Sequence, residues 1–337
     1  MTSRVSLQPL RQTLLGVALA AVTVFAEPAA RAVLFYETAD ASHNTTAPTG
    51  TYTDSGWQYQ GLFGGFLGTA IGENYFITAT HVGTQSSSFV QTALFTGGVP
   101  VSYNINTGAF GGNGFYDIPG TDLRIYQTIE SFSTWAPLYE GSLEAGMTAV
   151  VTGRGGARGS AVTLDTGMGN ELKGWVALNP DGTTRWGTNV ISAVVPDALS
   201  DVGPLLRMEF NAVLGTEEAM LSSGDSGGAV FVNDGGIWKL AGINYAIDGN
   251  FNTSPSDAGA FSAALLDKDG FYEGSGATWI FNGEDMVDTP SSFYASQISP
   301  YAGTINGIVT APEPGSALLA TAALLLFARR RRQPTEG

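Results

Sequence analysis

The chain has 337 residues, of which 43% are hydrophobic; it is long enough for one large or two modest cores, which excludes a disordered protein. It contains no cysteine and only two histidines, which excludes disulfides and cysteine-based metal sites and argues against a multi-histidine metal site. Residues 33–328 contain 8 Lys and Arg and 28 Asp and Glu, which gives a formal charge of −20 compared with −15 for the whole chain. So acidic a surface argues against nucleic acid as a partner.

Residues 1–32 have the organisation of a secretory signal peptide. Arg4 and Arg11 precede an apolar run over 13–26, and small residues follow it. Cleavage sites with small residues lie at 30–32 (Ala-Arg-Ala) and, as a second choice, at 24–26. A membrane helix is the alternative, but the run has about 14 residues where a span needs ~20. The sequence therefore predicts export.

The middle of the chain predicts an all-β protein. Residues 33–55 are mostly polar and lack periodicity, which predicts an extended N-terminal arm. From residue 56 onward, short apolar runs alternate with Gly, Asn, Asp and Ser, the pattern of strands joined by turns. We expect strands near 75–79, 149–154, 205–210, 228–232 and 238–247, with turns at 72–74 and 179–182.

The two histidines lie in different settings. His43 belongs to the polar arm, where no neighbouring element would fix its ring. His81 follows the apolar strand at 75–79, which would deliver its imidazole to a defined place. A histidine at a strand end is more often structural than catalytic, so its role depends on what accompanies it.

Two aspartates are candidates to orient a histidine. Asp122 stands just before an alternating strand, "LRIYQT", and Asp117 in "FYDIPG" is its rival. A carboxylate at a strand edge can be partly buried and accept a hydrogen bond from a histidine Nδ1–H. The alternative for Asp122 is a turn-capping role.

Ser226 lies in "LSSGDSGGAVFV", residues 221–232, between an acidic residue and two glycines. A tight turn before a strand has similar composition. A reactive serine needs a base to take its proton and a third group to orient that base. The candidate for the base is His81, and the candidate for the group that orients it is Asp122.

The end of the chain carries two further patterns. Residues 299–309 predict a helix, with Ser299 as its cap and Pro300 in its first turn. The segment 267–270, "DKDG", has the start of a calcium loop without the downstream ligands, so a plain turn is favoured.

The last 27 residues resemble a bacterial sorting signal. Pro312-Glu313-Pro314 precedes an apolar segment over 315–328, and four arginines, 329–332, close it. This order resembles the PEP-CTERM signal of Gram-negative bacteria, while an ordinary C-terminal anchor helix is the alternative. The resemblance implies transient anchoring in the inner membrane, processing by an exosortase-type enzyme, and release to the cell surface or its matrix.

Together, "TATHV", "TDLRIY" and "GDSGGAVF" resemble the chymotrypsin/trypsin family of serine endopeptidases, in the same His, Asp, Ser order. The resemblance covers roughly residues 56–310. It implies two antiparallel six-stranded β-barrels with the three residues between them, and a short C-terminal helix.

The resemblance also implies roles for individual residues. Ser226 would be the nucleophile, His81 the general base and Asp122 its orienting acid, and the N–H groups of Gly224 and Ser226 would form the oxyanion hole. A specificity pocket would have Met220 at its base and Leu221 in its lining, and would accept uncharged small or apolar side chains. Residues 242–247 and 258–261 would form its walls, with Tyr245 or Asn244 narrowing it. In many relatives a newly cut amino terminus pairs with the aspartate that corresponds to Asp225, but this chain has no typical activation sequence.

The leading hypothesis is thus an exported serine endopeptidase that acts on proteins or peptides and needs no cofactor or metal. One alternative is a non-catalytic surface or matrix-binding protein on the same fold. Another is a structural matrix protein, for which the order of the three motifs would be a coincidence.

Overall fold

A computed structural model of the chain describes residues 33–310 except 41, 166, 168 and 284–286. The predicted signal peptide, 1–32, and sorting signal, 311–337, lie outside the described residues and stay predictions. Among the described helices, none has both the length and the apolar character that crossing a membrane requires.

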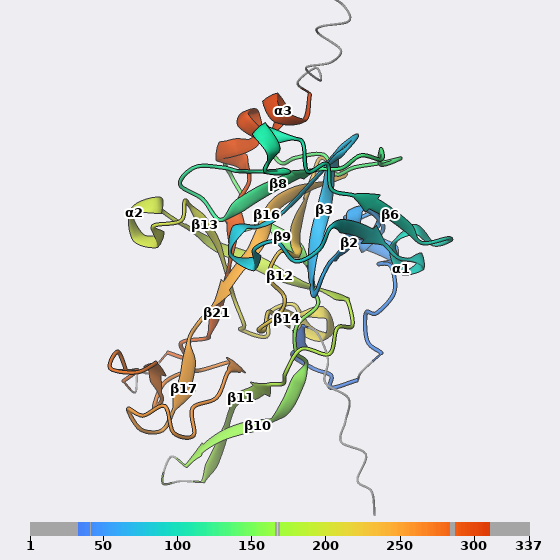
Figure 1. The fold of residues 1–337 in the computed structure, drawn as a ribbon. Coiled ribbons are helices and arrows are strands. Elements are labelled where there is room, and N and C mark those ends of the chain that lie inside the picture. The colour runs from blue at the N-terminus through green and yellow to red at the C-terminus, as the bar shows by residue number, and fades with distance from the viewer. Residues whose placement is uncertain (1–32, 41, 166, 168, 284–286, 311–337) are drawn as a thin grey trace, which may run out of the picture.

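The N-terminal half forms a seven-stranded antiparallel sheet, drawn in blue to green in Figure 1. Its strands run in the order β6 (Val101–Asn104), β5 (Ser88–Gln91), β2 (Gln60–Phe63), β3 (Phe66–Gly72), β4 (Tyr75–Ala79), β8 (Leu123–Gln127) and β7 (Phe115–Asp117). Strand β4 has the predicted bounds, and all five of its residues are buried. Phe76 and Ile77 belong to different core clusters, so both faces of this strand are covered and its sequence does not alternate.

The C-terminal half forms a closed six-stranded antiparallel barrel. Its strands run in the order β12 (Arg185–Val195), β13 (Leu205–Glu209), β21 (Ser292–Gln297), β16 (Ile237–Ile247), β15 (Ala229–Asp234) and β9 (Thr148–Gly153). Strands β9, β13, β15 and β16 lie within one or two residues of their predicted bounds, whereas β21 was not predicted.

The predicted all-β fold class is confirmed, and the second unit is the predicted six-stranded barrel, whereas the first unit differs. The first unit has seven strands instead of six and stays open, because β6 and β7 stand at opposite edges of the sheet. An isolated bridge between Ile105 and Thr128 links the segments that follow β6 and β8.

The two units share a hydrophobic core. One cluster joins Ile77 and Ile125 of the first sheet to Phe231 and Leu240 of the barrel, all fully buried. Within the first sheet, Phe76 stacks against Tyr126 with the ring centroids 5.1 Å apart. Each aromatic pair contributes about 0.5–1.5 kcal/mol beyond its buried area, which helps to hold a chain without disulfides.

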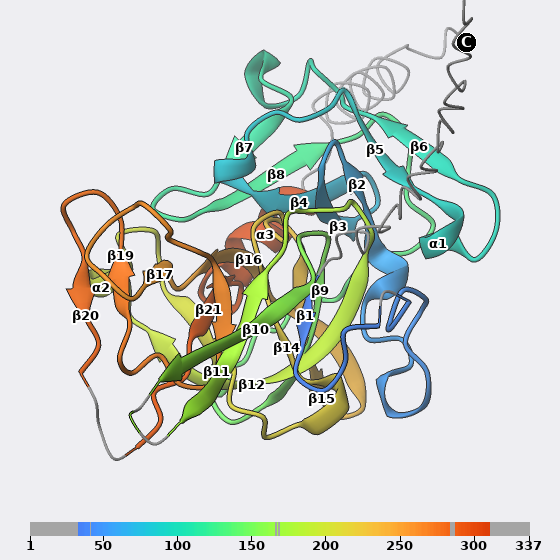
Figure 2. The same ribbon diagram turned by 90° about the horizontal axis from the view of Figure 1, so that it is seen from below.

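Two small sheets extend the barrel and were not predicted. One contains β10 (Arg158–Asp165), β11 (Asn170–Ala177) and β18 (Ala263–Leu265), and the other contains β17 (Asn250–Asn252), β19 (Tyr272–Gly274) and β20 (Ile280–Phe281). Both lie at the end of the molecule away from helix α3 (Ala302–Val309), as Figure 1 shows. Figure 2 shows the seven-stranded sheet on one side of the molecule and the barrel with these sheets on the other.

The segment from residue 33 to 55 is not the free extended arm that its polar composition predicted. Val33, Leu34 and Phe35 are buried, and β1 (Leu34–Phe35) pairs with β14 (Ala219–Met220). His43 is also held, since its Nε2 lies 3.2 Å from a carboxylate oxygen of Glu217 and its ring packs edge-on against Phe35. The apolar triplet at 33–35 outweighs the polar residues that follow, because burying it stabilises the docked segment.

The helices are short. The predicted helix at 299–309 is a 3₁₀ turn, η6 (Ser299–Tyr301), followed by α3, and Ser299 donates its hydroxyl proton to Glu144 instead of capping the helix. The other helical segments are α1 (Ala93–Thr96), α2 (Asp197–Ser200) and the 3₁₀ turns η1 (Gly50–Tyr52), η2 (Trp57–Tyr59), η3 (Thr80–Val82), η4 (Phe110–Gly112) and η5 (Gly215–Glu217).

Candidate active site

The structure brings His81, Asp122 and Ser226 together. Strands β4 and β8 pair antiparallel with Ala79 opposite Leu123, so the residues just after β4 and just before β8 are neighbours. His81 Nδ1 lies 2.6 Å from Asp122 Oδ2, and His81 Nε2 lies 2.7 Å from Ser226 Oγ. The three side chains therefore form one continuous hydrogen-bonded chain from carboxylate to hydroxyl.

Asp122 fixes both the imidazole and the backbone that carries it. Its Oδ1 accepts the backbone N–H of His81 at 2.8 Å, and its carbonyl accepts the N–H of Thr80 at 2.8 Å. Asp122 is buried, whereas the side chain of His81 is 38% exposed. A buried carboxylate on Nδ1 selects the tautomer in which Nε2 is free to accept a proton from Ser226.

The rival acid, Asp117, is engaged elsewhere. Its two carboxylate oxygens accept hydrogen bonds from Nε and Nη2 of Arg124, at 2.5 and 2.9 Å. This bidentate pair raises the pKa of the Arg124 guanidinium above its usual value, mainly through the hydrogen bond to Asp117. Of the two candidate acids, only Asp122 contacts His81 among the described residues.

The loop that carries Ser226 presents two N–H groups without acceptors. Within the described part of the chain, the N–H groups of Gly224 and Ser226 make no hydrogen bond, while that of Asp225 between them donates to the Ser222 carbonyl. Gly224 has φ of +95°, and a Cβ there would lie 2.8 Å from Pro180. Two unengaged N–H groups beside a serine Oγ can stabilise an oxyanion that forms on its target.

Asp225 is a buried carboxylate that holds this loop. It accepts the N–H of Gly155 at 2.5 Å and the N–H of Ser222 at 2.7 Å. A Cβ on Gly153 would lie 2.1 Å from its Oδ1, so the segment 153–156 fits closely around it. Burial raises the pKa of Asp225 to about 6, and the N–H donors oppose that rise.

A cavity of about 150 Å³ adjoins Ser226. Its lining contains Leu221, Ser222, Ser223, Asp225, Ser226, Asn244, Tyr245, Ala246 and Ile247. The ring of Tyr245 also packs edge-on against the His81 imidazole, with the ring centroids 5.7 Å apart. Two of the three residues expected in a specificity pocket, Leu221 and Tyr245, are therefore beside the serine.

The third, Met220, is not in the lining of this cavity. It is 1% exposed, belongs to the barrel core and pairs with Leu34 of β1. The pairing with β1, which the sequence did not predict, places this residue in the core. Residues 258–261, expected in the pocket walls, are also absent from the lining.

Asn244 was expected only as one of two residues that could narrow the pocket, and sequence reasoning missed the contacts by which it and three other residues shape this region. Asn244 donates from Nδ2 to the carbonyls of Thr152 and Asp225, at 2.9 and 3.0 Å, and so ties the serine loop to strand β9. Gly153, Gly155 and Ser222 surround Asp225. The glycine-rich segment "GRGG" at 153–156 was the available signal for this close packing.

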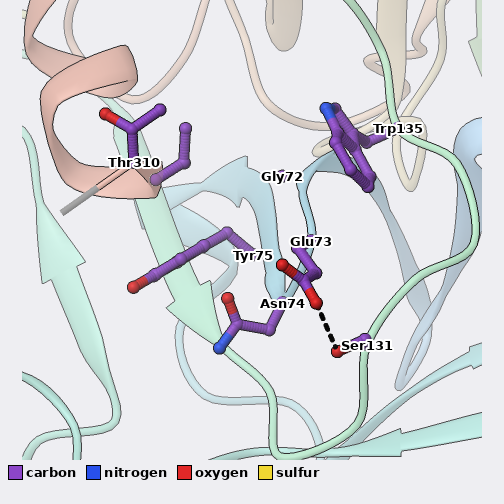
Figure 3. Close-up of a pocket in the computed structure, with 8 residues that line it drawn as sticks. Gly72, Glu73, Asn74, Tyr75, Ser131, Trp135 and Thr310 are labelled. Carbon is purple, nitrogen blue, oxygen red and sulfur yellow. Dashed lines mark hydrogen bonds between the residues drawn. The ribbon is translucent and has the colours of Figure 1, made fainter. Parts of the chain in front are cut away.

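A larger cavity, of about 510 Å³, lies at the other end of strand β4 (Figure 3). The turn at Glu73 and Asn74, the Trp135 ring and Thr310 surround it, and Glu73 accepts a hydrogen bond from the Ser131 hydroxyl at 3.3 Å. Because Tyr75 begins β4 and His81 follows its end, this cavity is separate from the triad.

No family model matches the chain, and no curated protein matches it. Among solved structures, human heparin binding protein is similar with a TM-score of 0.43 at 14% identity, over 77% of this chain and 95% of that chain. An atomic-resolution structure of HBP gives a TM-score of 0.42 at 12% identity over the same shares.

Proposed function

We propose that the protein is an exported serine endopeptidase. The observation that carries this proposal is the hydrogen-bonded chain from Asp122 through His81 to Ser226, with the unengaged N–H groups of Gly224 and Ser226 beside the nucleophile. These are the groups that acyl transfer from a peptide bond requires, in hydrogen-bonding contact.

The chemistry assigns a part to each group. Ser226 Oγ attacks the peptide carbonyl while His81 Nε2 takes its proton, and the N–H groups of Gly224 and Ser226 stabilise the negative oxygen. His81 then gives the proton to the leaving amine, and water hydrolyses the acyl-enzyme by the same steps. Asp122 holds the imidazole in place and stabilises the imidazolium.

Labelling by a fluorophosphonate probe tests this function, because the probe reacts with serines that a base has activated. Purified protein should gain the mass of one probe, and Ser226→Ala should gain none. If the wild type does not react, the protein is a non-catalytic binding protein on this fold, and the proposal is wrong.

We expect cleavage after uncharged, small or medium apolar residues. The 150 Å³ cavity beside Ser226 contains one carboxylate, that of Asp225, which Gly155 and Ser222 already engage. Burying an unpaired Lys or Arg there is costly, so we expect cleavage after them to be at least ~100-fold slower. Apolar side chains that differ by one methylene differ by only ~1–3 kcal/mol, so the preference should be broad. Profiling with a peptide library measures this, and dominant cleavage after Arg or Lys would contradict it.

We further propose that cleavage after Ala32 supplies Asp225 with a counter-ion. Val33 is buried and shares a small cavity with Ala157, two residues beyond the Gly155 that donates to Asp225. The next residue, Leu34, pairs with Met220, five positions before Asp225. In this proposal an ammonium group on Val33 reaches the Asp225 carboxylate, whose present donors are all neutral, and leaves a cavity that it shares with Arg158 and Arg185.

The pH dependence of stability distinguishes the uncleaved chain from the form that begins at Val33. With residues still preceding Val33, Asp225 has a pKa of about 6, above its unfolded value. Its stabilising contribution is then fully present below about pH 4 and lost as the pH rises through 6. The free energy of unfolding of the wild type, relative to Asp225→Asn, should fall by up to about 3 kcal/mol across that range. In the form that begins at Val33, an ion pair should reverse the slope, and equal slopes in both forms would contradict the counter-ion.

Export should leave processed termini. We expect the released protein to begin at Val33 and to lack the segment from about Pro314 onward, which intact-mass measurement would show. Replacing Arg329 to Arg332 by neutral residues should disturb retention in the membrane, because this cluster resists translocation. Recovery of a cytoplasmic protein that still carries Met1 would contradict the export proposal.

A further inference from the structure

Cations are scarce in this acidic protein, and nearly all are neutralised. Residues 33–310 contain eight Lys and Arg. Six of them lie within 4.0 Å of a carboxylate oxygen, namely Arg124, Lys173, Arg185, Arg207, Lys239 and Lys268. Among the described residues, Arg154 and Arg158 have no such partner.

Arg158 has another role, while Arg154 has no ion-pair contact. The Asp181 carboxylate attracts Arg154 only at longer range and forms its ion pair with Arg185. The Arg158 guanidinium lies 3.8 Å from the Trp175 ring centroid and donates to the Tyr36 carbonyl, which secures the N-terminal segment. Arg154 makes one side-chain hydrogen bond, from Nη1 to the carbonyl of Gly65 at 3.1 Å, and its Nε is buried without an acceptor in the described structure. A guanidinium has five N–H donors, so Arg154 has capacity for a further ligand.

The position of Arg154 relates it to Ser226. Its neighbour Gly155 donates to Asp225, and its own partner Gly65 immediately precedes strand β3. Leu67 of β3 borders the serine loop, because a Cβ on Gly227 would lie 2.5 Å from the Leu67 carbonyl oxygen. The Arg154–Gly65 bond thus joins the two units on the β3 side of Ser226.

The small cavity meets Ser226 through a different element, strand β16. Its walls include Tyr245, Ala246 and Ile247 of β16. A cavity that touches Ser226 accepts the side chain of the residue whose carbonyl is attacked. The substrate beyond the scissile bond then continues toward β3, Gly65 and Arg154.

We propose that Arg154 binds an acidic side chain on the leaving-group side of the substrate, within the first three residues after the scissile bond. This inference rests on the proposed endopeptidase function. A carboxylate matches the guanidinium as a bidentate acceptor and forms charge-assisted hydrogen bonds. The surrounding surface, with its large negative charge, would otherwise repel an acidic substrate, so the preference must come from this local cation.

Quenched fluorescent peptides test the assignment. All have the same residues before the scissile bond, taken from a good substrate found by profiling with the peptide library. They carry Asp, Asn or Lys at one of the three positions after that bond. At one position, the wild type should show kcat/KM about tenfold higher for Asp than for Asn, the size of one charge-assisted hydrogen bond. Lys there should be the poorest residue.

Three variants locate the effect. In Arg154→Gln the ratio of kcat/KM for the Asp peptide to that for the Asn peptide should fall to about one. Arg154→Lys should keep part of the preference for Asp. Arg207→Gln removes the same charge from strand β13, away from the serine, and should keep the wild-type ratio. Because each ratio compares two peptides on one protein, a loss of folded enzyme lowers both rates and leaves the ratio unchanged.

The outcomes distinguish the two proposals. An active wild type that cleaves Asp and Asn peptides equally, or a ratio that survives in Arg154→Gln, overturns the role of Arg154 and leaves the peptidase function standing. Failure to cleave any peptide overturns the function and the inference together.

Discussion

Replacing Ser226 by alanine is expected to lower kcat for peptide hydrolysis by about 10⁶-fold, and His81→Ala should cause a similar loss. The two effects should be alike because Ser226 Oγ lies 2.7 Å from His81 Nε2, and in the proposed mechanism each group acts only together with the other. The double variant should therefore be little worse than either single one. Steady-state kinetics on the best library peptide, with circular dichroism to check folding, measures this.

His43 provides the matched control for His81. It contacts Glu217 and Phe35, and it has no part in the hydrogen-bonded chain to Ser226. His43→Ala should therefore cost some stability through the N-terminal segment while kcat changes by less than a few-fold. Full activity in Ser226→Ala, or equal losses in the two histidine variants, would contradict the assignment of the triad.

The three residues of the triad could be predicted because each lies in a local sequence pattern that forms the expected strand or turn in the structure. The buried run before His81 and the strand after Asp122 became neighbouring strands, and their register alone brings the two residues together. The glycines around Ser226 indicated a tight loop, and a Cβ on Gly228 would indeed lie 2.0 Å from the Thr152 carbonyl oxygen. Such signals are readable because each depends on a few adjacent residues.

The features that sequence reasoning missed depend on long-range contacts. Met220 was expected in the pocket, but its place follows from pairing with Leu34, which lies 186 positions earlier in the chain. The strands β17, β19 and β20 have two or three residues each, too few to show a period. Arg154 drew no attention because only the folded chain shows that no carboxylate among the described residues forms an ion pair with it within 4.0 Å.

Buried polar contacts hold the serine loop in a chain that has no cysteine. Asn244 donates to the Asp225 carbonyl, Gly227 donates to the Asn244 carbonyl at 3.1 Å, and Asp225 accepts from two N–H groups. A buried network of this kind is costly to leave partly unsatisfied, so the loop has one favoured arrangement. That arrangement keeps the N–H groups of Gly224 and Ser226 available.

Asp122→Asn is expected to lower kcat by about 10⁴-fold while the protein stays folded, with KM nearly unchanged. The amide is nearly isosteric with the carboxylate and can still accept the backbone N–H of His81, which the wild type bonds at 2.8 Å. At the other atom an NH₂ group cannot accept from Nδ1–H, so the imidazole is driven to the tautomer whose Nε2 carries the proton and cannot take one from Ser226.

Asp117→Asn is the matched comparison, since it makes the same chemical change five residues away on the other candidate acid. It breaks the ion pair with Arg124, whose side chain is only 11% exposed although that of Asp117 is 43% exposed, so stability should fall by about 1–3 kcal/mol. The value of kcat should fall by less than a few-fold. Measuring kcat, KM and thermal unfolding for both variants separates the two aspartates. Asp122 forms a hydrogen bond with Nδ1 of the imidazole ring, whereas Asp117 bonds Arg124 instead. Equal kinetic losses in the two variants would therefore mean that the orienting acid has been misassigned.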